Sequence, residues 1–211
     1  MSTEQGQVLG THLNEVLLSL GEERLPPGLS DQFGIYAALL MRWNTRTNLT
    51  AIRDEDGILR RHFAECIVCA RTLPAGIGSL LDFGSGAGLP GIPIALCRSE
   101  IAVSLAESQG KKAAFLREAA RTLGLRLEVH SGRAEALERQ FDCVTLRAVD
   151  RMEKAVHAAT SLVATGGWIA LLVTEAEQEQ MKTAWGGLFS WREAVKLPGD
   201  SRLLLLGQKR Y

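Results

Sequence analysis

The chain has 211 residues, of which 46% are hydrophobic and 23% are charged. These fractions are ordinary for a globular protein and argue against disorder, and a chain of this length can bury a core without a disulfide or metal staple. The formal net charge is zero, which argues against a protein that coats nucleic acid through its total charge but leaves room for a local basic face.

The N-terminus is polar and lacks the basic and apolar blocks of a signal peptide, and no apolar run is long enough to span a bilayer. We therefore expect a cytoplasmic protein with no membrane segment. Cys66 and Cys69 form the only Cys-x-x-Cys pair, and no second pair of Cys or His stands at a usable zinc spacing. We interpret the cysteines as small buried thiols in a reducing compartment and expect no metal site.

The first part of the chain has helical periodicity. Apolar residues recur at intervals of three and four over 8–20 and again over 33–44, where Ser30 or Asp31 is placed to cap the helix start. A third helix is expected over about 54–73, because its acidic first residues suit a helix N-terminus. The sequence therefore predicts a small helical N-terminal segment.

After Pro74 the pattern changes to short apolar runs that alternate with helix-like segments. The runs that are typical of buried strands cover 79–83, 101–106, 125–130, 142–146 and 168–173. The helical patterns between them cover 92–97, 111–123 and 151–163. This alternation indicates βαβ units and a parallel sheet covered on both faces.

Two further strand-like runs, 189–197 and 202–209, flank a Pro-Gly-Asp-Ser turn and predict an antiparallel hairpin at the sheet edge. The predicted fold is α/β, with a Rossmann-like, mostly parallel sheet, an antiparallel C-terminal hairpin and the helical segment. We place the domain boundary between 1–73 and 74–211.

The most informative stretch runs from Asp82 to Gly91, where a buried strand enters closely spaced glycines and then a helix. Glycine lets the backbone turn tightly and approach a ligand with no Cβ in the way, and the next helix begins with unpaired N–H groups. Because ordinary strand–helix loops are short and do not need so many glycines, we expect a ligand at this turn.

Two ligands compete for the turn. Gly86-x-Gly88-x-x-Gly91 matches the dinucleotide-binding fingerprint. Counted from the strand end, Asp82-x-Gly84-x-Gly86-x-Gly88 resembles the first motif of class I methyltransferases, in which the backbone cradles the amino-acid part of S-adenosylmethionine. An aspartate suits the positive charge of that cofactor and is poorly suited to a pyrophosphate. We therefore favour S-adenosylmethionine over a nicotinamide dinucleotide.

Residues at the ends of the next strands complete the predicted site. Glu107 ends the second strand, where a carboxylate can accept hydrogen bonds from ribose hydroxyls. Ala134 and Glu135 follow the third strand, in a loop that borders the adenine in this architecture. Arg147 leaves the carboxyl end of the fourth strand, where ligands of open α/β sheets collect, and its planar donors suit carboxylate, phosphate or a guanine edge.

Taken together, these residues resemble the bacterial ribosomal RNA small-subunit methyltransferase G family, also called glucose-inhibited division protein B. Trp43–Ile52 looks like the family's N-terminal signature and is followed by Arg61-His62-Phe63, while Asp82–Pro93 looks like its cofactor turn. Further matches fall at Gly110–Lys112, Phe115-Leu116, Arg133–Glu135 and Arg147-Ala148. The resemblance covers most of the chain.

The resemblance implies methyl transfer from S-adenosylmethionine to N7 of one guanine in the 16S rRNA of the small ribosomal subunit. N7 already carries a free lone pair, so the reaction needs alignment rather than deprotonation, and Arg147 or Arg133 would orient the guanine as catalytic residues. The expected cofactor contacts are Asp82, Gly84, Ser85, Gly86, Gly88, Leu89, Glu107, Ser108, Ala134, Glu135 and Arg147. We expect the enzyme to act as a monomer.

The predicted RNA surface has two interpretations. Lysines and arginines in the helical segment and over 111–121 could meet RNA phosphates, but the many acidic residues of the helical segment equally suit a solvated surface of mixed charge. Trp43, Asn44 and Asn48 are candidate RNA contacts, although a tryptophan at helical spacing also suits a core. Where the family usually carries Lys-Gly after the fifth strand, this chain has Thr174-Glu175, so a cation is missing there.

Two other functions stay open at this stage. A small-molecule methyltransferase would use the helical segment as a lid over its pocket. A cofactor-binding regulator without turnover would account for the missing Lys-Gly.

Overall fold

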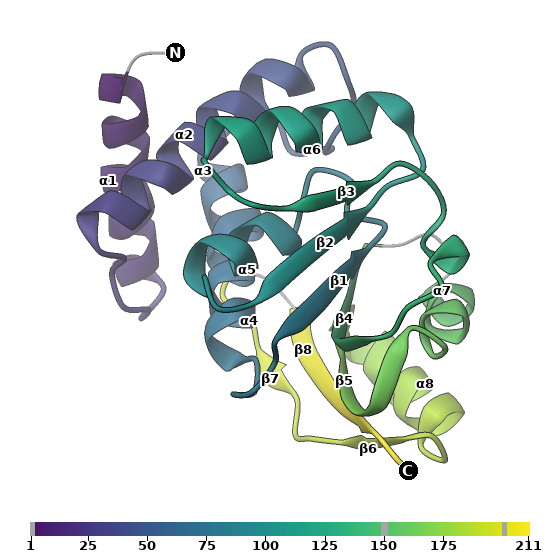
Figure 1. Ribbon diagram of the computed structural model, residues 1–211. Coiled ribbons are helices and arrows are strands. Elements are labelled where there is room, and N and C mark those ends of the chain that lie inside the picture. The colour runs from purple at the N-terminus through teal and green to yellow at the C-terminus, as the bar shows by residue number, and fades with distance from the viewer. Residues whose placement is uncertain (1–2, 149–151, 200–201) are drawn as a thin grey trace.

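The computed structural model describes residues 3–148, 152–199 and 202–211 (Figure 1). A central sheet separates two layers of helices. One buried cluster joins one face of the sheet to the N-terminal helices and to the helices that follow the first two strands, and a second cluster joins the other face to the last two helices. The predicted Rossmann-like α/β fold is confirmed.

The chain begins with helices α1 (Thr3–Ser19) and α2 (Pro27–Asn44). Pro27 occupies the first position of α2, where its fixed φ suits a helix start and its missing N–H is not needed. Ser30 lies inside the first turn, and its hydroxyl donates to the Pro27 carbonyl at 2.8 Å. The predicted cap at Ser30 or Asp31 is therefore wrong, because the proline starts the helix one turn earlier.

The third predicted helix forms as one continuous stretch with a change of winding. It consists of α3 (Glu55–Ile58), the π-helical segment η1 (Leu59–Ala64) and α4 (Glu65–Thr72). The Asp54 carboxylate accepts from the Gly57 N–H at 2.7 Å and caps the start, as the acidic cluster predicted. The sequence pattern gave no sign of the wider π-helical turn.

The five predicted strands form a parallel set, and connecting segments lie between them. The strands are β1 (Ser79–Phe83), β2 (Ala102–Ala106), β3 (Glu128–His130), β4 (Phe141–Arg147) and β5 (Val163–Thr174). The connections contain α5 (Gly91–Cys97), α6 (Gly110–Thr122), the short η2 (Ala134–Ala136) and α7 (Met152–Ala159).

The C-terminal part adds helix α8 (Glu175–Trp185) and strands β6 (Phe189–Trp191), β7 (Val195–Lys196) and β8 (Arg202–Lys209). The spatial order is β3-β2-β1-β4-β5-β8-β6, with β7 paired to β8. The predicted antiparallel hairpin is confirmed: β6 and β7 both pair with β8 at one end of the sheet, and β8 joins them to β5.

The helical segment and the sheet share one hydrophobic core. Phe33, Tyr36 and Phe63 are fully buried, and the rings of Tyr36 and Phe63 stack with centroids 5.0 Å apart. The same buried cluster includes Leu80 of β1 and Leu105 of β2. The division at Pro74 stays a prediction, and the two parts it separates are packed together.

Helices α1 and α2 approach each other through glycines. A Cβ on Gly34 of α2 would lie 1.8 Å from the Gly6 carbonyl oxygen and 2.7 Å from the Gly10 nitrogen of α1. Such distances are far below van der Waals contact with backbone atoms that no rotamer change can move. Glycine at this crossing is what lets the two backbones touch.

We predict that Gly34→Ala lowers the free energy of unfolding by about 3 kcal/mol, because the added methyl group overpacks the crossing. The matched control is Gly28→Ala in the same helix, where a Cβ meets nothing within 4 Å and should leave stability unchanged or slightly higher. Urea unfolding followed by circular dichroism measures both. Equal stability of the two variants would contradict the tight crossing.

Candidate active site

The candidate site lies where the strand order reverses. From β1 the chain continues on one side through β2 and β3 and on the other through β4 and β5, so β1 and β4 are neighbours at a topological switch point. In open α/β sheets, ligands bind beyond the carboxyl ends of the strands at this point. The glycine turn after β1 occupies that place.

Three glycines of the turn have left-handed backbone conformations. The φ angles are +71° at Gly84, +55° at Gly86 and +83° at Gly88, a region that residues with a Cβ rarely adopt. A Cβ on Gly86 would have only the Gly84 carbonyl oxygen near it, at 3.9 Å. The backbone here therefore borders open space, as a ligand cradle requires.

Asp82 supports the turn from beneath. Its carboxylate is 1% exposed and accepts from the Gly91 N–H at 3.1 Å and from the Thr145 hydroxyl at 3.0 Å. Burial raises the pKa of Asp82 to about 6, and the hydrogen bonds from Thr145 and Gly91 oppose that rise. Asp82 thus holds the two ends of the turn together, and its predicted contact with the cofactor stays a prediction.

Packing alone explains why residue 91 is a glycine, without a bound dinucleotide. A Cβ at this position would lie 2.4 Å from a Leu105 methyl carbon and 2.8 Å from an Asp82 carboxylate oxygen. The glycine that completes the dinucleotide-like spacing is therefore explained by the close approach of α5 to the sheet.

Glu107 lies beside the turn at the end of β2. It is 6% exposed, and its two carboxylate oxygens accept from the backbone N–H groups of Gly86, at 2.9 Å, and Gln109, at 2.7 Å. A carboxylate offers about four lone-pair sites, so these bonds leave capacity for the hydroxyls of a ribose. The predicted acid and the glycine cradle are thus joined by a direct hydrogen bond.

The remaining cofactor candidates lie around this pair. The Ser85 hydroxyl donates to the Asp82 carbonyl at 2.9 Å, and Leu89 is buried, so both help to shape the turn. Ala134 is buried in one cluster with Phe83 and Ala106, which end β1 and β2. Ser108, Arg133 and Glu135 are exposed. No described contact ties Arg133 to the turn.

Tyr36 links the helical segment to the turn. Its buried hydroxyl donates to the carbonyl of Ala87 at 2.5 Å, and burial raises its pKa well above the usual value. Tyr36 was not predicted as a site residue, because its apolar neighbours on α2 indicate only a core position. Thr145 was missed for a similar reason, since a threonine in a buried strand has no local sign of its partner.

Arg147 makes hydrogen bonds and an ion pair with residues of the helical segment. One of its terminal nitrogens donates to the Glu65 carboxylate at 2.7 Å and to the Arg61 carbonyl at 2.7 Å, and it lies 2.9 Å from His62 Nδ1. The side chains of the ion pair are 5% and 1% exposed for Arg147 and Glu65. Its Nε is buried without a hydrogen-bond partner among the described residues. The predicted contacts of Arg147 with cofactor and guanine stay predictions.

The Arg61-His62-Phe63 motif therefore sits against the carboxyl edge of the sheet. It lies on the π-helical segment η1, and such segments are frequent at functional sites. Arg147 reaches a carbonyl, a ring nitrogen and a carboxylate of this one helical stretch. The ion pair with Glu65 thus fixes η1 beside the end of β4.

His62 is held neutral at this place. Nδ1 of His62 lies 2.9 Å from the Arg147 guanidinium and 3.1 Å from the Arg61 carbonyl, and Nε2 lies 2.7 Å from the Thr50 hydroxyl. Burial lowers the pKa of His62 to about 3, and the Arg147 charge acts in the same direction. A protonated His62 would place two cations side by side.

Two motif residues have structural roles. Asn44 is 4% exposed, and its amide nitrogen donates to the carbonyls of Thr50 and Ile52 while its oxygen accepts from the N–H groups of Leu49 and Thr50. Its predicted RNA contact is therefore wrong, because the whole amide is used to hold the loop. Thr174 caps α8 in a capping box with Glu177, so the position of the expected Lys-Gly begins a helix.

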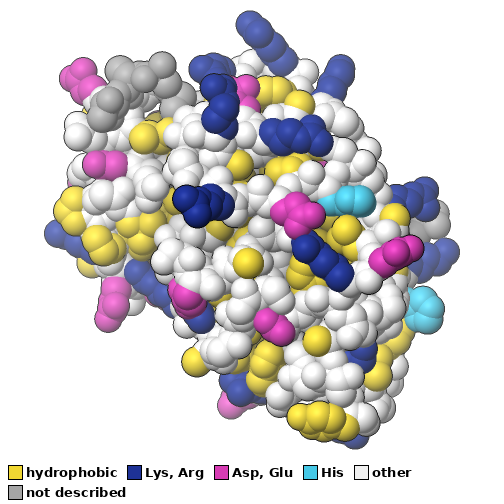
Figure 2. All heavy atoms as spheres, in the orientation of Figure 1, with side chains coloured by type: hydrophobic (Ala, Val, Ile, Leu, Met, Phe, Trp, Pro, Cys, Tyr) yellow, Lys and Arg dark blue, Asp and Glu magenta, His cyan; other side chains and the backbone are white. Residues whose placement is uncertain are grey.

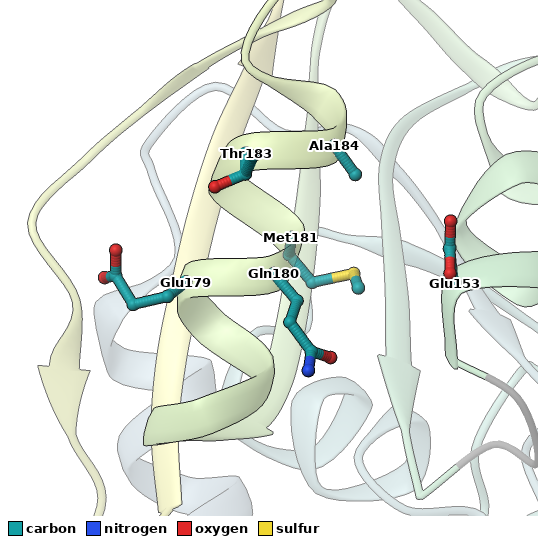
Figure 3. A pocket seen from close by; sticks show the side chains of 6 residues that line it. All are labelled: Glu153, Glu179, Gln180, Met181, Thr183 and Ala184. Carbon is teal, nitrogen blue, oxygen red and sulfur yellow. The ribbon is translucent and has the colours of Figure 1, made fainter.

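A cavity of about 560 Å³ lies between α7 and α8, where Glu153 faces Gln180 and Met181 across the gap (Figure 3). None of the predicted site residues lines it.

Among the described residues, no group of three or more His, Cys, Asp or Glu could hold a metal ion, and no helix has the length and apolar content to cross a membrane. Cys66, Cys69 and Cys143 are buried free thiols, as predicted, and Cys97 is half-buried.

Solved structures share this arrangement. The chain superposes on the ribosomal protein L11 methylase of Lactobacillus delbrueckii subsp. bulgaricus with a TM-score of 0.60 and 10% identity, over 70% of this chain and 77% of that one. It superposes on M. jannaschii TYW2 in complex with AdoMet with a TM-score of 0.56 and 16% identity, over 71% and 76%. The fold is therefore that of the class I α/β methyltransferases.

The sequence comparisons narrow this class to a family. Residues 29–191 match the family model of rRNA small subunit methyltransferase G. The chain is 49% identical to the ribosomal RNA small subunit methyltransferase G of Roseiflexus sp. (strain RS-1), over 60% of this chain and 57% of that protein. It is 43% identical to that of Halorhodospira halophila (strain DSM 244 / SL1), over 81% and 83%. The chain therefore belongs to the rRNA small subunit methyltransferase G family.

We predict that His62 makes stability depend on pH between about 6.5 and 3. In this window the unfolded chain binds a proton at His62 and the folded protein does not, so stability falls as pH falls. Going from pH 7.5 to 5.0, wild type should lose roughly 1 kcal/mol or more beyond the loss in His62→Gln.

Urea unfolding at the two pH values tests this prediction, with His157→Gln, which removes an exposed histidine, as the control. Asp82 acts in the opposite direction between its usual pKa and about 6, but it does so in all three proteins and cancels in the comparison. An equal loss in wild type and His62→Gln would show that His62 is not held neutral.

Proposed function

We propose that this protein transfers a methyl group from S-adenosylmethionine to N7 of a guanine in the 16S rRNA of the small ribosomal subunit. The cofactor supplies an electrophilic methyl group on a sulfonium centre. The observation that carries the proposal is the turn: three glycines in left-handed conformation over a buried Asp82, with Glu107 hydrogen-bonded to Gly86. Membership of the family supports the rRNA substrate.

Different residues around the turn would bind different parts of the cofactor. The backbone from Gly84 to Leu89 would hold the amino-acid part, because its left-handed glycines turn the chain tightly and a Cβ at Gly86 would meet nothing closer than 3.9 Å. Glu107 would accept from the ribose hydroxyls, as its free lone pairs allow. Ala134 and Glu135, which follow β3, would border the adenine.

The guanine would enter between the turn and η1. Its N7 lone pair is available without deprotonation, so the protein has to align the nucleophile with the methyl group rather than remove a proton. Arg147 acts here as a positioning residue, because its ion pair with Glu65 keeps η1 in place. The exposed Arg133 remains the candidate donor to the guanine edge.

We predict that Gly86→Val abolishes S-adenosylmethionine binding, because a branched side chain at φ +55° strains the turn and fills the cradle. Gly124→Val is the matched control, since Gly124 has φ +66° and open space around it at the end of α6. Both variants carry similar backbone strain, but only the first should lose affinity in isothermal titration calorimetry. Retained binding in Gly86→Val would move the cofactor away from this turn.

Methyl transfer from radiolabelled S-adenosylmethionine to small ribosomal subunits that lack their own N7 modification tests the reaction. Label that is recovered as 7-methylguanosine in 16S rRNA is the expected result. Cofactor binding without label in any RNA would overturn the proposal and leave a small-molecule methyltransferase or a regulator. Label on another rRNA atom would keep the substrate class and contradict the N7 assignment.

A further inference from the structure

The surface where α2 ends carries a second concave site. A pocket of about 250 Å³ is lined by Arg42, Trp43, Thr45, Arg46 and Thr47. None of these residues belongs to the glycine turn or to the Glu107 site. In Figure 2, lysine and arginine side chains project from the upper part of the view, where α6 runs in front of the end of α2 in Figure 1.

The pocket is built on a fixed framework. Asn44, in the middle of the lining segment, makes four hydrogen bonds of 2.9 to 3.2 Å to the backbone of residues 49–52. The Trp43 ring packs edge-on against Phe115 of α6, with centroids 5.7 Å apart and a 64° angle between planes. The indole and the loop are therefore positioned before any ligand arrives.

The charge around the pocket is mainly positive. Arg42 pairs with Glu118 of α6 at 2.7 Å, and 57% of its side chain is exposed. An exposed pair of this kind adds little stability, so an anionic ligand can compete for the guanidinium. Lys111 lies one helical turn before Phe115 on α6, which places a further cation on the side of the helix that meets Trp43.

We propose that this pocket binds one unpaired nucleotide of the rRNA, at a position outside the methyl-transfer site. The base would lie against the Trp43 indole, the phosphates against Arg42 and Arg46, and the hydroxyls of Thr45 and Thr47 would meet polar edges or the 2′-OH. Proteins recognise single-stranded RNA through this combination of aromatic stacking, arginine and polar contacts. The inference rests on the proposed function, because rRNA is the polymer that brings the nucleotide.

The size and place of the pocket agree with this occupant. Pockets for drug-sized ligands measure about 300–1,000 Å³, so 250 Å³ suits a smaller group such as one base. Trp43 and Tyr36 lie on the same helix, and seven residues of α2 span about 10 Å. Because Tyr36 contacts the glycine turn at Ala87, one RNA segment can reach both the pocket and the reacting site.

The first test compares two charge reversals. Arg46→Glu should raise the KM for small ribosomal subunits by on the order of tenfold with little change in kcat. The slope of log affinity for RNA against log salt concentration should fall by about the amount that one phosphate contact contributes. Arg24→Glu is the control, since this exposed arginine precedes α2 and lies at the far end of that helix. Affinity for S-adenosylmethionine should be the same in both variants. Equal KM values would overturn the pocket as an RNA site while wild-type methylation still supports the proposed function.

A second test needs no variant. Small subunits whose rRNA contains 4-thiouridine are mixed with wild-type protein and S-adenosylhomocysteine, irradiated, and digested with trypsin and nuclease. The expected nucleotide adduct lies on the peptide Trp43–Arg46. Adducts elsewhere only, or a cross-link of this peptide to a ribosomal protein, would contradict the inference. The cross-link tests the pocket whether or not a methyl group is transferred. Failure of methyl transfer would contradict the proposed function and not the pocket.

Discussion

The buried ion pair between Arg147 and Glu65 joins segments that are 82 residues apart in the sequence. Taking two charges out of water costs several kcal/mol for each ion, and removal of one partner from such a pair is strongly destabilising. The same arginine also binds the Arg61 carbonyl and His62. Because these three contacts reach one helical stretch, a single guanidinium ties η1 to the end of β4, in addition to the core packing of Leu59 and Phe63.

The electrostatics of the site follow from this arrangement. The positive charge of Arg147 lowers the pKa of both His62 and Asp82, but burial exceeds that effect at Asp82 and raises its pKa to about 6. Asp82 is stabilised in its place by Thr145 and the Gly91 N–H rather than by a direct ion pair. The carboxylate that remains beside the cradle is Glu107, which meets the turn through Gly86. Both acids therefore brace the turn, Asp82 from beneath through the Gly91 N–H and Glu107 from beside it through the Gly86 N–H.

The parts of this architecture that depend on local sequence could be predicted, and those that depend on distant partners could not. The glycine turn, Glu107 and the parallel strands are visible because their spacing and apolar runs are local properties. The insertion of β8 beside β5 is decided by tertiary pairing. Helix α8 was missed although Thr174 and Glu177 form a capping box, a local sign that sequence analysis did not use.

The same distinction applies to the site residues. Arg147 could be placed at the carboxyl end of its strand, but its partner Glu65 lies in a helix whose pattern looks only apolar. Asn44 resembles a ligand-binding residue in sequence, and only the folded loop shows that its four bonds are internal. Polar side chains in a motif have no local mark that separates a structural hydrogen bond from a contact with a ligand.

The packing of the helical segment bears on how substrate reaches the site. A lid must open at a low energetic cost, yet Phe33, Tyr36 and Phe63 have no exposed surface and share their cluster with β1 and β2. Opening would expose these aromatic side chains, each worth about 1.5–3 kcal/mol of burial or more, and would break the Arg147–Glu65 pair. The segment is therefore a fixed wall of the site. A fixed wall whose outer pocket is lined by Arg42, Trp43 and Arg46 suits a large polymer that approaches from outside better than a small molecule that must be enclosed.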